Sequence, residues 1–381
     1  MDFALNEEQK AIQRTARDFA RREIDPIVDE HDEKQIYPLA VMKKAAALGF
    51  LGVIFPDTYG GAGLSYVDYV LVVTELSKVD PSVGISVAAH NSLGTNHIYK
   101  FGNEAQRRRW VTPLAHGEKI AAWALTEPGS GSDAAAARTR AQRVDGGWVL
   151  DGNKVFCTHG AVGDVCVVMA VSDPEARKGR NMSAFVLEKG MPGFRPGKKE
   201  NKLGIRASDT SEVVLENCFV PDDHLLGEPG EGFKQALAVL DGGRISIAAL
   251  GLGTAIGAYE CALAYAKQRE QFDQPIAGFQ AIRFALAEMA TRIAAAEALT
   301  FAAAVEMDRT GKVTLKASEA KLMTGEVAVF CAERAVQIHG GYGFVKDYRA
   351  EKFYRDAKIC TIGEGTSEVQ RLVIARQLLS A

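Results

Sequence analysis

Glu364 is the residue whose type and surroundings best suit acid–base chemistry. It lies between Gly363 and Gly365, just before Thr366-Ser367-Glu368, where a helix is predicted to begin. The two glycines give the backbone unusual freedom and leave space above the carboxylate. A glutamate in a loop usually faces solvent, whereas in a dry pocket it would be a general base with a raised pKa. The segment alone leaves both interpretations open.

A second segment, Trp123–Asp133, has the composition of a ligand-binding loop. Gly129 and Gly131 allow backbone N–H groups to approach a ligand closely, and the threonine and serine hydroxyls add hydrogen-bond donors and acceptors. A turn at a domain boundary is the alternative interpretation. The length and mixed polarity of the segment favour a binding site.

Glycines also gather in Gln337–Gly343, after a helix predicted to end near His339. They indicate either a backbone that passes close to a ligand or a helix C-cap followed by a turn. Another glycine-rich stretch, Gly251–Gly257, is similar to a dinucleotide-binding loop, but its sixth position is Ile256 and helical patterns flank it on both sides. Because that fingerprint needs a preceding strand and a glycine at the sixth position, close helix packing explains it better and a nicotinamide-dependent enzyme is disfavoured.

Three zones of different periodicity must position these segments. Residues 1–118 are predicted to be helical, with a capping box at Asn6 and Gln9. Residues 119–228 carry short β-branched runs between turn signals such as Asp145–Gly147 and Asp151–Asn153, which are typical of hairpins. Residues 229–381 are helical again, with long apolar stretches over 244–269 and 279–307. No long helix separates the strands, so the fold class is α+β, mostly α, with an antiparallel sheet or small barrel in the middle.

The composition excludes several classes of function. A chain of 381 residues with a formal net charge of −3 is too long for one domain and has no basic field to attract nucleic acid. Its longest apolar runs, such as Val165–Val171, are far shorter than the ~20 residues of a membrane span. The first residues show no secretory signal. The six cysteines form no C-x-x-C pair, so buried reduced thiols and no metal site are expected. We expect a cytoplasmic protein.

The three segments stand together in the order and spacing of a known family. Thr126–Asp133, the Gln-x-x-Gly-Gly segment at Gln337–Gly341 and the Glu-Gly-Thr-Ser-Glu segment at Glu364–Glu368 resemble those of the acyl-CoA dehydrogenases, and the likeness extends over essentially the whole chain. The resemblance is to bacterial short-chain or short-branched-chain members. It implies a helical N-terminal domain (1–118), a small middle β domain (119–228) and a C-terminal four-helix-bundle domain (229–381).

The resemblance also implies ligands and partners: FAD as cofactor, an acyl-CoA substrate from fatty-acid or amino-acid catabolism, and an electron-transfer flavoprotein as electron acceptor. The expected assembly is a homotetramer, a dimer of dimers, in which neighbouring subunits share FAD sites. The residues implied to bind FAD are Trp123, Leu125, Thr126, Gly131, Ser132, Phe156, Thr158, Arg269, Phe272, Gln280, Gln337, Gly340, Gly341, Thr366 and Glu368. Those implied to bind the CoA thioester are Ser132, Asp241, Arg244 and Gly365.

Single residues of these sets have plainer alternatives. Arg269 could be a surface arginine, Phe156 ordinary core, and Asp241 the cap of a long helix that begins there. The aligned context favours the family roles. Arg269, Phe272 and Gln280 would reach the FAD of a neighbouring subunit. Thr366–Glu368 would cover the flavin phosphates from a helix N-terminus.

The resemblance implies a mechanism centred on Glu364. It would remove the α-proton of the thioester while the β-hydride passes to flavin N5, giving a trans-2-enoyl-CoA. The thioester oxygen would accept hydrogen bonds from the Glu364 N–H and a flavin ribityl hydroxyl, an oxyanion hole. Some members carry the base at the position of Gly243, which cannot act here. Glutaryl-type members carry an arginine near the position of Gly84, so a dicarboxylate substrate is disfavoured.

Departures from the family pattern bear on the substrate. Gly363 replaces a common tyrosine and leaves room beside the base, Phe156 replaces a tryptophan, and Asp273 replaces a glycine. Asn91 and Ser92 lie in the stretch that floors the acyl pocket in relatives. We therefore expect a short or short-branched acyl chain. Two alternatives remain: an acyl-CoA oxidase or atypical CoA-thioester flavoenzyme on the same scaffold, and a flavin-free helical binding protein.

Overall fold

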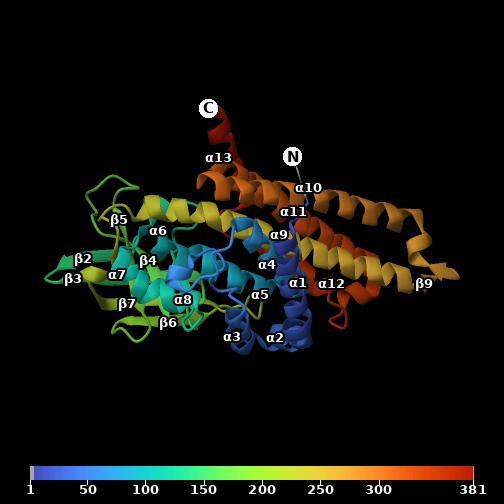
Figure 1. Ribbon diagram of the computed structural model, residues 1–381, viewed down its shortest axis with the longest axis horizontal. Coiled ribbons are helices and arrows are strands. Elements are labelled where there is room, and N and C mark those ends of the chain that lie inside the picture. Colours follow the sequence, from blue (N-terminus) through green and yellow to red (C-terminus); the bar gives the residue numbers. More distant parts are fainter. Residues whose placement is uncertain (1–3, 381) are drawn as a thin grey trace.

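The computed structural model describes residues 4–380 and is elongated, with a β-sheet at one end and long helices running toward the other (Figure 1). Met1–Phe3, part of the segment in which no secretory signal is recognised, lie outside the described residues. The first helices are α1 (Glu7–Phe19), α2 (Val28–Lys34), α3 (Leu39–Ala47), α4 (Tyr66–Val79), α5 (Pro81–Ala89), the π-helical η4 (His90–Thr95), α6 (Asn96–Phe101), α7 (Glu104–Gln106) and α8 (Thr112–Ala115).

The predicted start of the first helix is confirmed. The Asn6 side chain accepts a hydrogen bond from the Gln9 N–H at 2.8 Å, and the Gln9 side chain accepts one from the Asn6 N–H at 3.0 Å. This reciprocal pair satisfies two N–H groups that have no partner within the helix. It fixes where α1 begins.

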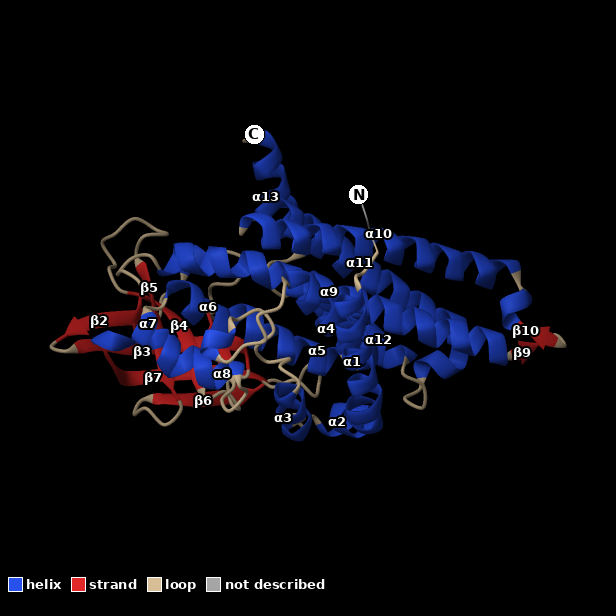
Figure 2. Ribbon diagram, viewed as in Figure 1, coloured by secondary structure: helices blue, strands red, loops and turns tan. Residues whose placement is uncertain are grey.

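Strands fill the middle of the chain and form one sheet (Figure 2). They are β1 (Ala121–Ala124), β2 (Arg140–Val144), β3 (Gly147–Thr158), β4 (Val165–Val171), β5 (Met182–Glu188), β6 (Phe194–Lys199), β7 (Thr210–Pro221) and β8 (Leu225–Leu226). Their spatial order is β6-β7-β3-β2-β4-β5-β8, with β1 paired to β4. The division into domains at residues 118 and 228 stays a prediction.

The sheet is mixed, which corrects the expectation of a purely antiparallel one. Strand β1 runs parallel to β4 over Ala121–Ala124, and β2 is parallel to β4 at one residue pair. The long connection that contains the β2–β3 hairpin carries the chain back, so a parallel pair forms without a crossover helix. The expected turn at Asp151–Asn153 is also wrong: β3 continues through it with a register shift beside Gly152. The turn at Gly146, with φ +74°, is confirmed.

The buried strand β4 shows why the sheet stays at this end of the molecule. Its side chains alternate between two apolar clusters, as a pleated strand requires. Val167 and Met169 pack in one cluster with Trp110 of the helical region, whereas Cys166 and Val168 pack in the other with Leu150 of β3. Both faces are therefore dry, which matches the continuous apolar sequence of β4.

The remaining helices are α9 (Gly232–Gln268), α10 (Gln280–Thr310), α11 (Thr314–His339), α12 (Ala350–Ala357) and α13 (Ser367–Leu379). Helix α9 begins at Gly232, well before the predicted start, so Asp241 lies inside the helix and does not cap it. Although α9 is long and apolar enough to cross a membrane, most of that stretch is buried inside the protein. Gly251–Gly257 lies within this helix, where Gly251 and Gly253 pack against α11 and α4. The glycine-rich stretch is thus a packing surface, as expected.

A buried ionic cluster joins three parts of the chain. Lys352 of α12 donates to Asp80, the N-cap of α5, at 2.7 Å and to Asp356 at 2.6 Å. Asp356 also accepts a hydrogen bond from the N–H of Ile205, in the loop after β6. All three charged side chains are nearly inaccessible to water. The cluster therefore holds the sheet region and the two helical regions in register.

Replacing Lys352 with alanine is expected to lower the free energy of unfolding by roughly 3–5 kcal/mol, because it leaves two buried carboxylates without their cation. Urea unfolding at neutral pH measures this difference. The control is Lys10→Ala, which breaks an exposed ion pair with Glu7 and should cost under about 1 kcal/mol. Equal midpoints for the two variants would contradict the structural role of Lys352.

Candidate active site

The Glu364 loop has an unusual backbone that its glycines make possible. It connects η10 (Lys358–Thr361) to α13, and Thr366 caps α13 by accepting a hydrogen bond from the Val369 N–H at 3.3 Å. Glu364 has φ +54° and Gly365 has φ +95°. A glutamate is rarely found in the left-handed region, and such strain is concentrated at functional sites. The predicted helix start at Thr366 or Ser367 is confirmed.

Two buried side chains hold this loop in place. The Lys321 ammonium donates to the Gly365 carbonyl at 2.6 Å. The Gln370 amide donates to the carbonyls of Glu364 and Gly365 at 3.2 and 2.9 Å. The direction in which the Glu364 side chain leaves the backbone is therefore fixed by contacts from α11 and α13.

The Glu364 carboxylate points into the protein. Its Oε2 atom is buried and has no hydrogen-bond partner among residues 4–380. Burial raises the pKa of Glu364 to about 7, against the opposing effect of the cations Lys321 and Arg244. The residue as a whole is half-buried, but this carboxylate oxygen is turned away from solvent, as the general-base interpretation requires.

Gly243 of α9 lies directly against that carboxylate. A Cβ atom added to Gly243 would lie far inside 3.0 Å of Glu364 Oε2 and 3.1 Å from Leu93. Leu93 belongs to a small apolar cluster with Ala89, and Trp123 of β1 packs against this cluster. The elements that meet here are thus α9, η4, β1 and the Glu364 loop.

Asp241 and Arg244 lie one turn apart on α9 and bind each other. The Arg244 guanidinium donates to Asp241 at 2.8 Å, and Thr314 donates to the other carboxylate oxygen at 2.6 Å. Arg244 is 5% exposed, and its Nε atom has no partner within the described chain. The positive charge of Arg244 also lowers the pKa of Glu364. The structure therefore places Arg244 beside the carboxylate and Asp241 behind it.

Asn91 was expected in the floor of the acyl pocket, and Gly84 where an arginine would bind a dicarboxylate substrate. The contacts of both residues are with the protein's own helices and loops. The Asn91 side chain binds only backbone: it accepts from the Val53 N–H at 3.2 Å and donates to Phe50 and Val87 carbonyls at 2.9 Å. A Cβ atom on Gly84 would meet Ser77 of α4. Asn91 is thus a structural residue, and the absence of an arginine at Gly84 says little about the substrate.

The loop after β1 is tied to β3 by backbone and by a buried ion pair. The Thr126 carbonyl accepts from the Val155 N–H at 2.9 Å. Lys154 is fully buried and donates to the Leu125 carbonyl at 3.1 Å and to Glu127 at 2.7 Å. These contacts bring the predicted residues Leu125 and Thr126 next to the segment that contains Phe156 and Thr158.

Phe156 is exposed and strained, so the core alternative for it is wrong. Its side chain is 66% exposed and its φ is +57°. It lies where the β3–β7 register shifts between Lys154 and Cys157. Nearby, a Cβ atom on Gly131 would meet nothing within 4 Å, and Ser132 is exposed. An aromatic ring held open beside a glycine-rich loop fits a planar cofactor.

Unpartnered polar atoms around the Glu364 loop fit the same cofactor. Besides Glu364 Oε2 and Arg244 Nε, the buried Ser367 Oγ and Gln370 Oε1 have no partner among the described residues. Thr366 is the N-cap of α13 and Glu368 lies in its first turn, where the backbone N–H groups favour an anion. Buried polar groups are almost always hydrogen-bonded, so these atoms indicate a ligand.

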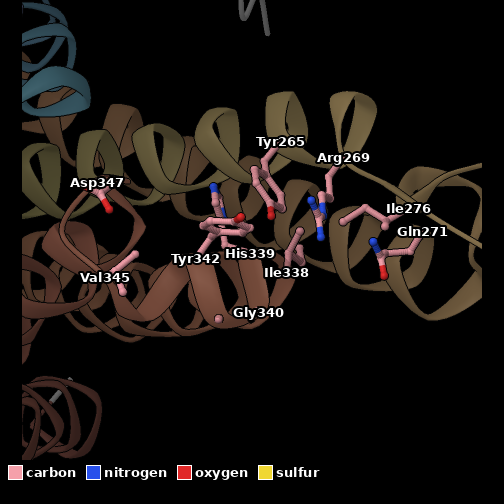
Figure 3. A pocket seen from close by; sticks show the side chains of 11 residues that line it. Tyr265, Arg269, Gln271, Ile276, Ile338, His339, Gly340, Tyr342, Val345 and Asp347 are labelled. Carbon is pink, nitrogen blue, oxygen red and sulfur yellow. The ribbon is translucent and has the colours of Figure 1, made fainter.

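Other predicted residues gather at the far end of the molecule. A cavity of about 560 Å³ is lined there by Arg269, Tyr342 and the segment Ile338–Gly341, among others (Figure 3). The Arg269 guanidinium lies over the Tyr342 ring, 5.5 Å from its centre. Arg269 is therefore part of a formed cavity and not a plain surface arginine. Gln337 and Gln280 are exposed beside this region, at the end of α11 and the start of α10.

Phe272 forms the tip of a short hairpin at the same end. Strands β9 (Glu270–Gln271) and β10 (Gln274–Pro275) are joined by Phe272 and Asp273, with φ +53° and +57°. Two successive positive φ angles define a type I′ turn, in which aspartate is tolerated in place of glycine. The Asp273 departure therefore has a simple explanation, and Phe272 is left 86% exposed.

The two groups of predicted residues are too far apart to hold one FAD molecule. Arg244 and Arg269 are roughly 37 Å apart along α9 at about 1.5 Å per residue. Figure 1 shows the β9 hairpin and the sheet at opposite ends of the molecule. The structure thus brings together Trp123–Thr158 with the Glu364 loop, and separately Arg269 with Ile338–Gly341.

Sequence reasoning missed four buried residues of the site. His97 accepts a hydrogen bond from the Trp123 indole at 3.0 Å, and Lys154, Glu127 and Lys321 hold the two loops. Lys154 and Glu127 gave a signal, since a lysine inside an otherwise strand-like run needs a carboxylate partner. Lys321 gave none, because Lys316, the other lysine of α11, also follows and precedes apolar residues but is exposed.

Comparison with known proteins agrees with this geometry. Family models described as the N-terminal, middle and C-terminal domains of acyl-CoA dehydrogenase match residues 6–118, 122–218 and 230–379. An acyl-CoA dehydrogenase of Bacillus subtilis is 45% identical over 376 residues, 98% of this chain and 99% of the relative. The chain therefore belongs to the acyl-CoA dehydrogenase family, and it is an oxidoreductase of that class.

Solved structures agree in fold over the full length. Butyryl-CoA dehydrogenase from Megasphaera elsdenii matches with a TM-score of 0.97 and 42% identity, covering 100% of both chains. A chain from a structure described as the electron transferring flavoprotein of Acidaminococcus fermentans matches with a TM-score of 0.98 and 45% identity, again over 100% of both. Membership in the family implies FAD as the cofactor.

Proposed function

We propose that this protein oxidises a short acyl-CoA to the trans-2-enoyl-CoA, with Glu364 as the base that removes the α-proton. The observation that carries the proposal is the Glu364 carboxyl group, whose Oε2 atom is buried without a hydrogen-bond partner among residues 4–380 and whose pKa is raised to about 7. An α-proton next to a thioester is weakly acidic. A desolvated carboxylate with a raised pKa is a suitable acceptor for it at neutral pH.

The chain's own residues position and polarise the substrate in this proposal. The Glu364 N–H lies in the same strained turn as its carboxylate and donates to the thioester oxygen, where negative charge develops. Gly365 leaves the approach open, and Ser132 and Arg244 contact the CoA part of the substrate. Leu93 and Trp123 exclude water from the reacting carbons.

FAD would be held by residues from both ends of the chain. Near the sheet, Thr126, Ser132, Phe156 and Thr158 surround the ring system, with Trp123, Leu125 and Gly131 completing that wall. Thr366 and Glu368 would bind it from the N-cap and the first turn of α13. When bound, FAD supplies the acceptor for the two electrons removed from the substrate.

The far-end residues indicate that two subunits complete each cofactor site. Arg269, Phe272 and Gln280, with Gln337, Gly340 and Gly341, would contact FAD bound to a neighbouring subunit. The exposed Phe272 ring and the open cavity beside Arg269 support this assignment. A homotetramer built as a dimer of dimers provides such pairs of sites.

The proposed substrate is a short or short-branched acyl chain. Gly363 supports it, because a Cβ atom there would have ordinary contacts of 3.5 Å or more, so no bulky side chain fills the space next to the base. Similarity to butyryl-CoA dehydrogenase supports it too. We propose an electron-transfer flavoprotein as acceptor, on the likeness to the Acidaminococcus structure, and a cytoplasmic location.

An anaerobic titration of the purified yellow protein with acyl-CoAs of increasing length tests the proposal. We expect loss of flavin absorbance with butyryl- or isobutyryl-CoA and progressively less with longer chains. No bleaching by any saturated acyl-CoA would refute the dehydrogenase activity, and a colourless protein would support a flavin-free binding protein. Rapid reoxidation of the product-bound enzyme by oxygen would instead identify an oxidase.

A further inference from the structure

Lys321 is a buried cation without a carboxylate in contact. It is 0% exposed on α11, and its ammonium donates to the Gly365 carbonyl at 2.6 Å. Within residues 4–380 it forms no ion pair, whereas the other two buried lysines, Lys154 and Lys352, each bind a carboxylate. An unpaired buried charge is costly. Its position therefore needs an explanation beyond packing.

The charged groups around Lys321 leave Glu364 as its electrostatic partner. Arg244 of α9 is already neutralised by Asp241, which Thr314 also binds. Cys360 of η10 is a buried thiol, and Glu368 of α13 is exposed. Tyr69 of α4 lies near Glu364 as a buried neutral phenol. Glu364 is thus the buried carboxylate that the Lys321 charge can stabilise.

We propose that Lys321 is a positioning residue for Glu364: it holds the Gly365 carbonyl, and its charge keeps the Glu364 carboxylate ionised near neutral pH. The proposal rests on the proposed role of Glu364 as the base. Geometry supports the first part directly, since one ammonium proton is used in holding the loop. The second part follows because the two charges are buried together in a medium that screens them weakly.

The two pKa values agree with this coupling. Burial lowers the pKa of Lys321 to about 8, and the nearby Cys360 and Glu364 oppose the shift. Burial raises the pKa of Glu364 to about 7, and Lys321 is the strongest opposing influence. Loss of the Lys321 charge would therefore raise the pKa of Glu364 further. Proton abstraction would then fail over a wider range of pH.

The test compares the rate of anaerobic flavin reduction between pH 5.5 and 9.5 in holoenzyme variants of Lys321. Lys321→Gln keeps a hydrogen-bond donor without the charge, Lys321→Met removes both, and Lys321→Arg keeps the charge. In wild type, the flavin reduction rate should fall at low pH as Glu364 becomes protonated; this fall is the acid limb of the pH profile. For the glutamine and methionine variants, the acid limb should move to higher pH by on the order of one unit. The arginine variant should retain the wild-type limb.

Gln370→Leu is the matched control. Gln370 holds the Gly365 carbonyl, as Lys321 does, and also the Glu364 carbonyl, but it carries no charge. Its loss should lower the rate by a similar factor at every pH. If Lys321→Gln also lowers the rate equally at every pH, Lys321 is only structural and the proposal is overturned. The same follows if Lys321→Arg moves the acid limb as far as Lys321→Gln does.

A second measurement separates this proposal from the proposed function. Glu364→Gln in the same assay should abolish the acid limb together with nearly all activity. If Glu364→Gln reduces flavin at the wild-type rate, the base assignment fails whatever Lys321 does. If it is inactive and the Lys321→Gln limb is unmoved, the base assignment stands and the role of Lys321 fails.

Discussion

Replacing Glu364 with glutamine is expected to slow reduction of the flavin by butyryl-CoA about 10²–10⁴-fold, the usual contribution of a general base. The amide has nearly the shape of the carboxylate but cannot accept the α-proton. Stopped-flow absorbance under anaerobic conditions measures the rate. The variant should still bind FAD and substrate, because the loop is held by Lys321 and Gln370 through backbone carbonyls.

The same substitution should stabilise the protein at alkaline pH. The folded-state pKa of Glu364 is raised to about 7, so the folded protein holds this proton more tightly than the unfolded chain. The carboxylate therefore destabilises the fold progressively as pH rises from the unfolded value of about 4.3 to the folded value, at about 1.4 kcal/mol per unit. Above pH 8 the cost reaches up to roughly 4 kcal/mol, and below pH 4 it is absent.

Urea unfolding of wild type and Glu364→Gln at pH 5 and pH 8 measures this difference. The variant should gain more stability relative to wild type at pH 8 than at pH 5. Glu326→Gln is the control, because Glu326 is exposed and pairs with Arg371 of α13. Glu326→Gln should alter neither the flavin reduction rate nor the difference in unfolding free energy between pH 5 and pH 8. An active Glu364→Gln enzyme would require another base.

Features set by local chemistry could be predicted from the sequence. The capping box at Asn6, the buried strand β4 and the helix start at Thr366 or Ser367 each depend on residues close together in the chain, and all three are confirmed. The family resemblance rested on such segments too. The start of α9 at Gly232 was missed because Gly242 and Gly243 look like helix breakers, whereas tertiary packing keeps them inside the helix.

Features set by distant contacts could not be predicted in the same way. The parallel pairing of β1 with β4 depends on where the chain returns after a hairpin. The burial of Lys321 depends on the loop at Gly365, and that of Lys154 on Glu127. For Phe156 the sequence left a flavin contact and ordinary core as alternatives, and the outward direction of its side chain depends on a register shift in β3. Glu364 was recognised from the sequence as the candidate base, but the effect of Lys321 and Arg244 on its pKa was not.

Gly243→Ala is expected to lower the flavin reduction rate about 10²-fold, because misplacing a reacting group by about 1 Å can cost that much. The added Cβ would lie far inside 3.0 Å of Glu364 Oε2, and on its other side it would meet Leu93 at 3.1 Å. The carboxylate must therefore move, since the backbone of α9 is held by the helices around it. In a helix interior, however, alanine is more stabilising than glycine by about 1 kcal/mol. The variant should thus fold well while losing activity.

Gly251→Ala provides the matched comparison for this substitution. Gly251 lies on the same helix, with the same helix-propensity gain and a nearest contact of 3.1 Å to the Thr324 carbonyl, but it has no contact with the Glu364 loop. It should keep a reduction rate within about threefold of wild type, well short of the loss expected from a misplaced group. If both variants lose activity equally, the effect comes from helix packing. If only Gly243→Ala does, the close approach of α9 keeps the carboxylate in its reactive position, and a side chain at this site is incompatible with a base at Glu364.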